Sequence, residues 1–397
     1  MPHLRERFLA RHIQTALKFS SLVGVLGQRQ VGKTTLLESL VGQDYVTMDD
    51  DQTLAAVLAK PQGYLENFSK LTAIDECQKA PELFSALKLR VQRDKRPGQF
   101  LLSGSVRFTS RKEIQETLTG RIFNLELLPM TLAETHHLPC LDYKTFFTAD
   151  FGKVQTILKK RQETLRPKSA EQYIKNGGLP GICFLREESH RNGKFKSHIE
   201  TLLQRDIRLI SKTTAPYDSL LLLLTYLAEN QGQAFSLKES AQAARLTQNT
   251  VKKLIEAFEG LFLIRRVVGF GFRTGPQYFL EDQGMASYLL LEKNKNYLSR
   301  FLFSQIFSNT HYAHQNKFQL GHFETKSGLR LDFVARLDDM NIGFLYEDTE
   351  APSSKALRAA ESFLAENKNS GVVLLGAGAK ALKMDRQMIH LPLNWIA

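Results

Sequence analysis

The sequence predicts an α/β protein with a mostly parallel sheet that is covered by helices on both faces. Between Ser21 and Arg121, short apolar runs alternate with amphipathic helical patterns, which is typical of a buried parallel sheet. The first run, SLVGVLG, leads into a glycine-rich loop and then a helical pattern. A later run, LTAIDE, ends in two acidic residues. These observations place a candidate site at the ends of the predicted strands.

Length and composition indicate a globular protein of two to four domains. The chain has 397 residues, of which 43% are hydrophobic and 24% charged, an ordinary globular composition. Its three cysteines are far apart, which argues against a disulfide framework or a zinc site and favours a reducing compartment. The N-terminus lacks the apolar core of a secretory signal, so we expect a cytoplasmic protein.

The sequence contains no segment that could span a membrane as a helix, and its charge is strongly positive. The longest apolar run, Leu220 to Leu224, is far shorter than the about 20 residues that a bilayer requires. A net charge of +12 favours a polyanionic partner, either nucleic acid or an anionic membrane surface. A basic but merely solvated surface explains the charge equally well.

The pattern changes twice beyond the first α/β region. Residues 136–209 are mostly helical and charged, which predicts a helical lid or connector. In residues 210–290, three helical patterns precede strand-like segments, and Ser236 with Glu239 forms a capping box; this order predicts a helix-turn-helix with a wing. Residues 291–397 again mix strands and helices, which indicates a second, smaller α/β unit.

The segment from Gly27 to Thr34, GQRQVGKT, fits the P-loop pattern between a strand and a helix. Its backbone N–H groups and the helix N-terminus are expected to bind phosphates. Lys33 should reach the β- and γ-phosphates, and the Thr34 hydroxyl should bind Mg²⁺. The predicted nucleotide-binding residues are Gly27, Gln30, Val31, Gly32, Lys33, Thr34 and Thr35.

The two acids of LTAIDE complete the predicted hydrolytic site. Asp75 is expected to hold the water shell of the metal, as in a Walker B motif. Glu76 then faces the γ-phosphate, where it can orient the attacking water or accept its proton. We therefore expect ATP and Mg²⁺ as ligands of an ATPase.

Three further residues are candidates for catalytic roles. Ser103 ends the run FLLSGS and can sense the γ-phosphate through a hydrogen bond, although Ser-Gly-Ser is also ordinary turn chemistry. Arg107 or Arg121 can supply the cation that stabilises charge in the transition state. Most arginines are surface residues, so both assignments are hypotheses.

The segments LGQRQVGKTTLL, YVTMDD, IDECQKAPELFSALK, FLLSGS and ETLTGRIFNLELLPMTLAE resemble a prokaryotic family of AAA+-like P-loop ATPases. Members of this family also carry a C-terminal domain of unknown function, matched by YIKNGGLPG, IETLLQRDIRLI, NTVKKLIEAFEGLFLI, YFLEDQGMASYLL and FETKSGLRLDFVARL. The resemblance implies an ATPase core with a five-stranded sheet at 1–135, a lid at 136–209, a winged helix at 210–290 and a restriction-endonuclease-like unit at 291–397.

The chain departs from this family at a few positions. In the ATPase half, this chain has Cys77 where the family often has an aliphatic residue, and Ser103 where the family often has threonine. In the terminal unit, Asp332 matches the nuclease-like Asp, but Glu347-Asp348-Thr349 stands where a Glu-x-Lys is expected. FLFSQIFSN lacks the early acid and offers only Ser304 or Gln305. Without these groups metal-assisted hydrolysis loses a ligand and a cation, so we expect an inactive unit.

The winged-helix segment carries candidate contacts to duplex DNA. They are Gln248, Asn249, Lys252, Lys253, Arg265, Arg266 and Arg273, which suit phosphate and base contacts. A protein-docking role or a solvated helix face fits them equally well.

The leading hypothesis is a nucleotide-driven switch with a protein partner or a second copy of the chain. One alternative is a DNA-processing ATPase with an active nuclease, and another is a nucleotide-binding module with little turnover.

Overall fold

The computed structural model describes residues 4–107, 118, 120–166, 168–271, 275–290, 297–315, 317–378 and 381–397. The chain divides into two compact units. Unit 1 comprises Met1–Pro129, Leu179–Tyr217 and Asn249–Ile264, and unit 2 comprises Met130–Gly178, Asp218–Gln248 and Arg265–Ala397. The chain therefore passes between the units several times, and each unit is described by itself.

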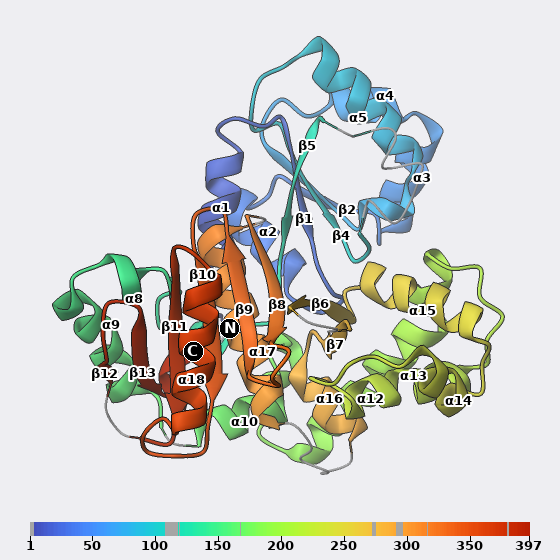
Figure 1. The fold of residues 1–397 in the computed structure, drawn as a ribbon. Coiled ribbons are helices and arrows are strands. Elements are labelled where there is room, and N and C mark those ends of the chain that lie inside the picture. Colours follow the sequence, from blue (N-terminus) through green and yellow to red (C-terminus); the bar gives the residue numbers. More distant parts are fainter. Residues whose placement is uncertain are drawn as a thin grey trace. The chain divides into compact units, whose positions relative to one another are not determined.

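Unit 1 contains a five-stranded sheet in the order β2-β3-β4-β1-β5 (Figure 1). Its strands are β1 (Leu22–Leu26), β2 (Tyr45–Thr47), β3 (Thr72–Asp75), β4 (Phe100–Gly104) and β5 (Ile122–Glu126). All four neighbouring pairs are parallel. Every residue of β1, β3 and β4 is buried, because helices cover the sheet. The predicted α/β class with a parallel sheet is confirmed.

The helices of unit 1 come from several segments of the chain. In its first segment they are α1 (Leu9–Ala16), α2 (Lys33–Val41), α3 (Asp51–Ala59), α4 (Pro61–Glu66), the 3-10 turn η1 (Cys77–Lys79) and α5 (Glu82–Arg93). Later segments add α11 (Pro180–Cys183), α12 (Glu188–Gln204), η3 (Asp206–Leu209) and most of α15 (Gln248–Gly260). On α5, Phe84 and Leu87 lie on one helical face and join Ile74 and Leu102 of the sheet in one buried cluster.

Unit 2 is built on an eight-stranded mixed sheet in the order β12-β13-β11-β10-β9-β8-β6-β7. Its strands are β6 (Ile264–Gly271), β7 (Gln277–Leu280), β8 (Phe318–Glu324), β9 (Arg330–Leu337), β10 (Asn341–Tyr346), β11 (Ser370–Gly376), β12 (Leu382–Lys383) and β13 (Met388–Pro392). The β8–β9 and β9–β10 pairs are antiparallel, whereas β10–β11 is parallel.

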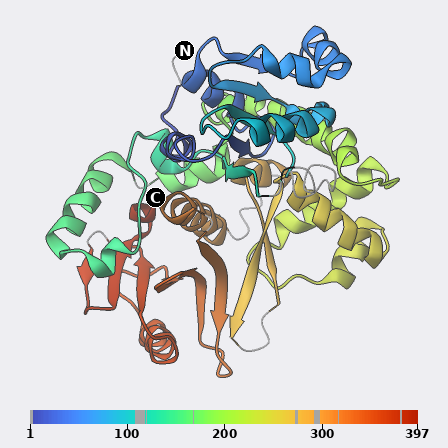
Figure 2. The same cartoon turned by 90° about the horizontal axis from the view of Figure 1, so that it is seen from above.

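Two long helices cover the central strands of this second sheet. α17 (Tyr297–His314) packs against β8 and β9, and α18 (Ser354–Glu366) packs against β9, β10 and β11. Successive residues of β9 point to opposite faces. Phe333 therefore meets Phe303 of α17, whereas Val334 joins the cluster of Phe363 on α18. Figure 2 shows the two helices on opposite sides of the strands.

The remaining helices of unit 2 include those that the sequence predicts before the strands β6 and β7. They are α7 (Leu132–Thr135), α8 (Thr145–Thr148), α9 (Phe151–Thr164), α10 (Ser169–Asn176), α13 (Tyr217–Glu229), α14 (Leu237–Ala244), α16 (Gln283–Leu289) and η4 (Leu393–Ile396). Ser236 caps α14, because its hydroxyl accepts the Glu239 N–H at 3.3 Å. The division between units falls at the start of α15, so the winged-helix arrangement stays a prediction, as do the four domain boundaries.

Two further features bear on the sequence-based expectations. Among the described residues, no helix combines the length and the apolar character that crossing a bilayer requires. Cys77, Cys140 and Cys183, all within the described residues, form no disulfide bond.

The stability of unit 1 should depend on the side chains of α5 that pack in its core. Phe84 is 1% exposed, so Phe84→Ala should lower the free energy of unfolding by about 3–5 kcal/mol. Leu89→Ala on the same helix is the control, because Leu89 is 39% exposed and its loss should cost far less. Urea unfolding should be followed by circular dichroism, since the single tryptophan, Trp395, lies in unit 2. Equal losses in the two variants would contradict the packing of α5.

Candidate nucleotide site

The glycine-rich loop connects β1 to α2 in unit 1. It begins directly after Leu26 and ends at Gly32, the residue before α2. Gly32 has φ +96°, and a Cβ on Gly27 would lie 2.3 Å from the Leu127 carbonyl oxygen. Both positions therefore require glycine, one for its backbone conformation and the other for space. Because no side chain caps α2 at Gly32, the positive end of the helix dipole is left for an anion.

The Lys33 side chain folds back across the loop. Its Nζ donates hydrogen bonds to the carbonyl oxygens of Gly27 at 3.0 Å and Gln28 at 3.1 Å. Burial lowers the pKa of Lys33, and the nearby Glu76 and Asp75 carboxylates oppose this shift. A phosphate group beside Nζ would stabilise the charged ammonium in the same way, so the side chain is suited to an anionic ligand.

The Asp75 carboxylate lies at the end of β3 and accepts hydrogen bonds from several elements. Its Oδ2 accepts from the Thr34 hydroxyl at 2.6 Å and from the Tyr45 hydroxyl at 2.7 Å. Its Oδ1 accepts from the Ser103 hydroxyl and from the Glu76 N–H at 3.0 Å. The structure thus brings the predicted metal-binding pair, Thr34 and Asp75, into direct contact.

Tyr45 is a member of this site that sequence reasoning missed. Burial, followed by the hydrogen bond to Asp75, raises the pKa of Tyr45 above its usual value, so its hydroxyl stays protonated and can donate. β2 pairs with β3 in the register Thr47↔Asp75, and only this pairing brings Tyr45 to the carboxylate. The run YVTMDD alone carries no signal for the contact.

Glu76 follows β3 in a left-handed conformation, with φ +52°. Its Oε2 accepts hydrogen bonds from the Gln78 side-chain amide and from the Ser105 hydroxyl, the latter at 3.4 Å. A non-glycine residue in this region is strained by about 1–3 kcal/mol. The strain and the side-chain contacts together fix the direction of the carboxylate, and neither Gln78 nor Ser105 is predicted from the sequence.

The two candidate arginines lie in different surroundings. Arg107 forms an ion pair with Glu126 at 3.1 Å, donates to the Glu259 carbonyl oxygen and lies over the Phe262 ring. Arg121 immediately precedes β5, which runs parallel to β1 in the register Leu22↔Ile122. Arg121 therefore lies at the N-terminal ends of these strands, whereas the loop follows Leu26 at their C-terminal ends. Each strand residue adds about 3.3 Å to the separation. The structure therefore does not bring Arg121 to the phosphate loop of its own chain.

Segments far away in the sequence also contact the loop. Arg7 donates to the carbonyl oxygens of Val31 at 2.8 Å and Leu128 at 2.5 Å. The Pro180 ring lies 3.3 Å from the position of a Cβ on Gly32. Arg29 of the loop forms an ion pair with Asp206 at 3.7 Å. All of these residues belong to unit 1, so the loop has close neighbours from two later parts of the chain.

The donor set at Thr34 and Asp75 fits Mg²⁺. A hydroxyl and a carboxylate oxygen 2.6 Å apart are the hard oxygen ligands that this ion prefers, and Mg²⁺ normally keeps several waters or phosphate oxygens in its shell. The described residues hold no group of three or more His, Cys, Asp or Glu suited to a metal. The site is therefore compatible with a metal held jointly with phosphates and does not form an all-protein cage.

The nuclease-like candidates of unit 2 have structural partners. Asp332 accepts the Tyr346 N–H at 2.9 Å, and burial raises the pKa of Asp332. Glu347 accepts from the N–H and hydroxyl of Ser353, the residue that caps α18. Ser304 and Gln305 are buried within α17. Asp332 does line a polar pocket of about 470 Å³, but Glu347 does not.

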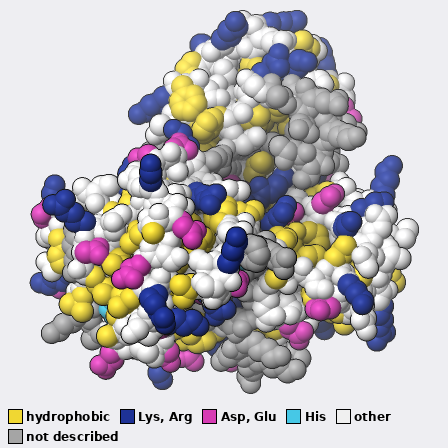
Figure 3. All heavy atoms as spheres, in the orientation of Figure 1, with side chains coloured by type: hydrophobic (Ala, Val, Ile, Leu, Met, Phe, Trp, Pro, Cys, Tyr) yellow, Lys and Arg dark blue, Asp and Glu magenta, His cyan; other side chains and the backbone are white. Residues whose placement is uncertain are grey.

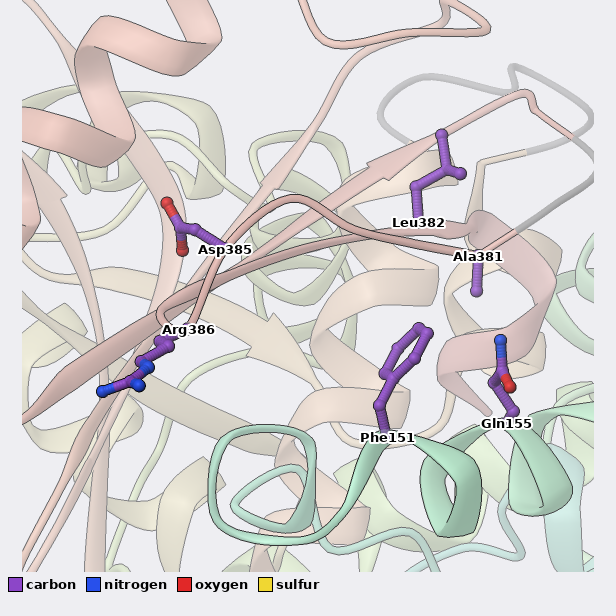
Figure 4. A pocket seen from close by; sticks show the side chains of 6 residues that line it. All are labelled: Phe151, Gln155, Ala381, Leu382, Asp385 and Arg386. Carbon is purple, nitrogen blue, oxygen red and sulfur yellow. The ribbon is translucent and has the colours of Figure 1, made fainter.

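A second hollow of unit 2, about 640 Å³, lies between α9 and the segment around β12 (Figure 4). Phe151 and Gln155 extend from α9 toward Ala381 in Figure 4. The Asp385 carboxylate accepts hydrogen bonds from the backbone N–H groups of Gln387 and Met388.

The candidate DNA contacts differ in exposure. Exposed side chains at the start of α15 are Gln248, Asn249, Lys252 and Lys253. Arg266 is exposed as well, whereas Arg265 pairs with Glu281 and lies over the Phe307 ring. Arg273 lies outside the described residues. On the face shown in Figure 3, Lys and Arg side chains are interspersed with acidic and hydrophobic ones.

Comparison with known families finds matches to two parts of the chain. Residues 20–136 match a family described as an AAA domain, and residues 167–296 match a domain of unknown function. Uncharacterized proteins of Mycobacterium tuberculosis and Mycobacterium bovis are each 26% identical over 90% of this chain and 77% of their own. An uncharacterized protein of Methanocaldococcus jannaschii is 22% identical over 93% of this chain and 85% of its own.

Solved structures show only distant similarity. A signal-transduction ATPase with a tetratricopeptide repeat sensor from Pyrococcus horikoshii aligns with a TM-score of 0.30 and 12% identity, over 79% of this chain and 48% of that one. DnaA from Aquifex aeolicus bound to AMPPCP aligns with a TM-score of 0.27 and 17% identity, over 63% and 86%. TM-scores this low do not establish a common fold. Residues 20–136 are thus similar to an AAA domain, and the five-stranded parallel sheet of unit 1 agrees with that similarity.

The close contact at Gly27 gives a testable consequence. Gly27→Ala places a methyl group against the Leu127 carbonyl, so it should destabilise unit 1 by about 1–3 kcal/mol. Gly193→Ala is the control, because this position in α12 has open space around it and should gain roughly 0.5–1 kcal/mol. Urea unfolding followed by circular dichroism measures both. A neutral effect of Gly27→Ala would mean that the loop does not pass this close to Leu127.

Proposed function

We propose that unit 1 binds the Mg²⁺ complex of ATP and hydrolyses it, and that the protein acts as a nucleotide-driven switch. The contact between the Thr34 hydroxyl and the Asp75 carboxylate carries this proposal. It joins the P-loop to the acidic end of β3, the arrangement that phosphoryl transfer requires. The match of residues 20–136 to an AAA domain supports the same activity.

In the proposed mechanism the backbone amides of the loop and the N-terminus of α2 bind the phosphates. Lys33 exchanges the carbonyl oxygens of Gly27 and Gln28 for the β- and γ-phosphates. Thr34 and Asp75 would hold Mg²⁺, which neutralises charge on the phosphates. Glu76 leaves Gln78 and Ser105 to orient the attacking water, and it accepts the proton of that water.

Two further residues support this chemistry in the proposal. The Ser103 hydroxyl donates to the Asp75 carboxylate and accepts the Glu76 N–H at 3.3 Å, and through these contacts we propose that it senses the γ-phosphate. In its own chain Arg121 lies at the ends of the strands opposite to the phosphate loop, so it would have to act on the site of a second copy. A role of Arg121 at the nucleotide would thus require a homo-oligomer.

Lys33 and Glu76 separate binding from hydrolysis. Lys33→Ala removes a charged donor worth about 1.5–3 kcal/mol, so ATP affinity should fall roughly ten- to hundredfold. Glu76→Gln should keep the affinity and abolish turnover. Calorimetric titration with ATP and phosphate release in Mg²⁺ measure the two effects. Negligible phosphate release by both the wild type and Glu76→Gln would favour a binding module, and unchanged ATP affinity in Lys33→Ala would contradict the proposed site.

The proposed switch includes a winged helix that binds duplex DNA through α15. This role is supported by the exposed polar residues at the start of that helix and by the net charge of +12. The terminal unit is proposed to be inactive as a nuclease, because Glu347 is engaged by Ser353 and Gln305 is fully buried. DNA cleavage in Mg²⁺ that persists in Lys33→Ala and Glu76→Gln would instead favour the DNA-processing alternative.

DNA binding has a matched test on two helices. The double variant Lys252→Glu/Lys253→Glu should abolish retention of duplex DNA in a gel shift at low salt, because it removes two candidate phosphate contacts. The control Lys159→Glu/Lys160→Glu changes two adjacent exposed lysines of α9 and should leave retention unchanged. Equal losses in the two variants would indicate non-specific attraction, and no retention of the wild type would remove the DNA role.

A further inference from the structure

A second polar cluster lies beside the phosphate loop. Gln28 and Arg29 are residues of the loop, whereas His198 belongs to α12 and Asp206 to η3. All four lie in unit 1. The nucleotide-binding and catalytic roles assigned above include none of them.

Three members of the cluster are buried without hydrogen-bond partners. Gln28 is 0%, His198 1% and Asp206 2% exposed. Within the described part of the chain, both amide atoms of Gln28, both ring nitrogens of His198 and both carboxylate oxygens of Asp206 lack a hydrogen bond. Buried polar groups are almost always paired, and an unpaired one is costly. Three such groups beside one loop indicate that the cluster has a functional role and does not serve packing alone.

The charges of the cluster are arranged around Arg29. Its Nη1 lies 3.7 Å from Asp206 Oδ2, and the Arg205 Nε lies 3.8 Å from Oδ1. Burial raises the pKa of Asp206, against the attraction of Arg29, Arg205 and Lys33 and together with the repulsion of Glu76. Burial, followed by Arg29 and Lys33, lowers the pKa of His198 to about 4, so this ring is neutral at pH 7. Asp206 is thus the carboxylate that balances the second cation of the loop.

We propose that Asp206 is a positioning residue which holds Arg29 until a triphosphate binds, and that Arg29 then contacts the terminal phosphate. The inference rests on the proposed nucleotide site. The Arg29–Asp206 pair is long and lacks a hydrogen bond, so it is easily exchanged. Phosphate oxygens offer the guanidinium a bidentate, charge-assisted contact instead. Arg205, whose side chain is 57% exposed, remains to neutralise Asp206.

Because of this exchange, the affinity of the loop for a nucleotide depends on the number of phosphates. A diphosphate is held by Lys33 and the backbone amides, and it leaves Arg29 on Asp206. A triphosphate adds a charged group that competes with Asp206 for the guanidinium. Arg29 therefore contributes to the affinity for ATP and hardly at all to that for ADP, and Asp206 weakens the ATP contact by competing with it.

The test is calorimetric titration of the full chain with ADP and with a non-hydrolysable ATP analogue in Mg²⁺. Arg29→Gln should weaken binding of the ATP analogue about tenfold and leave ADP within about twofold. Asp206→Asn should strengthen binding of the ATP analogue about three- to tenfold, because it removes the competitor. The double variant should match Arg29→Gln alone, since without the guanidinium Asp206 has nothing to hold. Arg208→Gln, an exposed neighbour in η3, is the control and should behave as the wild type.

The outcomes separate this inference from the function on which it rests. If the wild type binds both nucleotides but Arg29→Gln and Asp206→Asn keep the wild-type ratio of affinities, the Arg29–Asp206 role is overturned and the site stands. If Asp206→Asn weakens both nucleotides equally, Asp206 is merely structural and the inference also fails. If neither the wild type nor Arg208→Gln binds a nucleotide, the proposed function is overturned together with the inference.

Discussion

The Asp75 carboxylate is the point on which the candidate site depends. It accepts hydrogen bonds from Thr34 of α2, Tyr45 of β2 and Ser103 of β4, and therefore ties three elements to the end of β3. A buried carboxylate needs such donors, because an unpaired charge is costly to bury. The same hydrogen bonds place the P-loop hydroxyl beside the acid, so stability and site geometry come from one set of contacts.

The second constraint is the balance of charge around the loop. Two cations, Lys33 and Arg29, lie near three acids, Asp75, Glu76 and Asp206. All four of the other charges shift the pKa of Lys33, and Arg29 forms an ion pair with Asp206. Without a ligand, the cations are held by carbonyl oxygens and by an ion pair. A bound phosphate chain would take over these partners, and Asp206 would transmit the change to η3 and α12. The proposed nucleotide site and the later segment of unit 1 are thus linked through the Arg29–Asp206 ion pair.

The sequence predicts those parts of the site that are local. The P-loop is one contiguous segment, and Asp75 and Glu76 are adjacent residues at the end of β3. The glycine positions follow from the backbone that they must adopt. Tyr45, Arg7 and Asp206 escaped prediction because their contacts depend on strand register and on returning segments. Register also decides the place of Arg121, which its identity alone does not fix. Likewise α14 and α15 are predicted as helices from capping and periodicity, but their assembly is not a local property.

Amide hydrogen exchange tests the central claim most directly. If the backbone of the loop and the start of α2 bind the phosphates, saturating ATP with Mg²⁺ should slow exchange at the amides of Gly32, Lys33 and Thr34 in the wild type. Lys33→Ala at the same nucleotide concentration should show much weaker protection. Unchanged exchange at these amides under conditions where ATP demonstrably binds would place the nucleotide elsewhere and contradict the account.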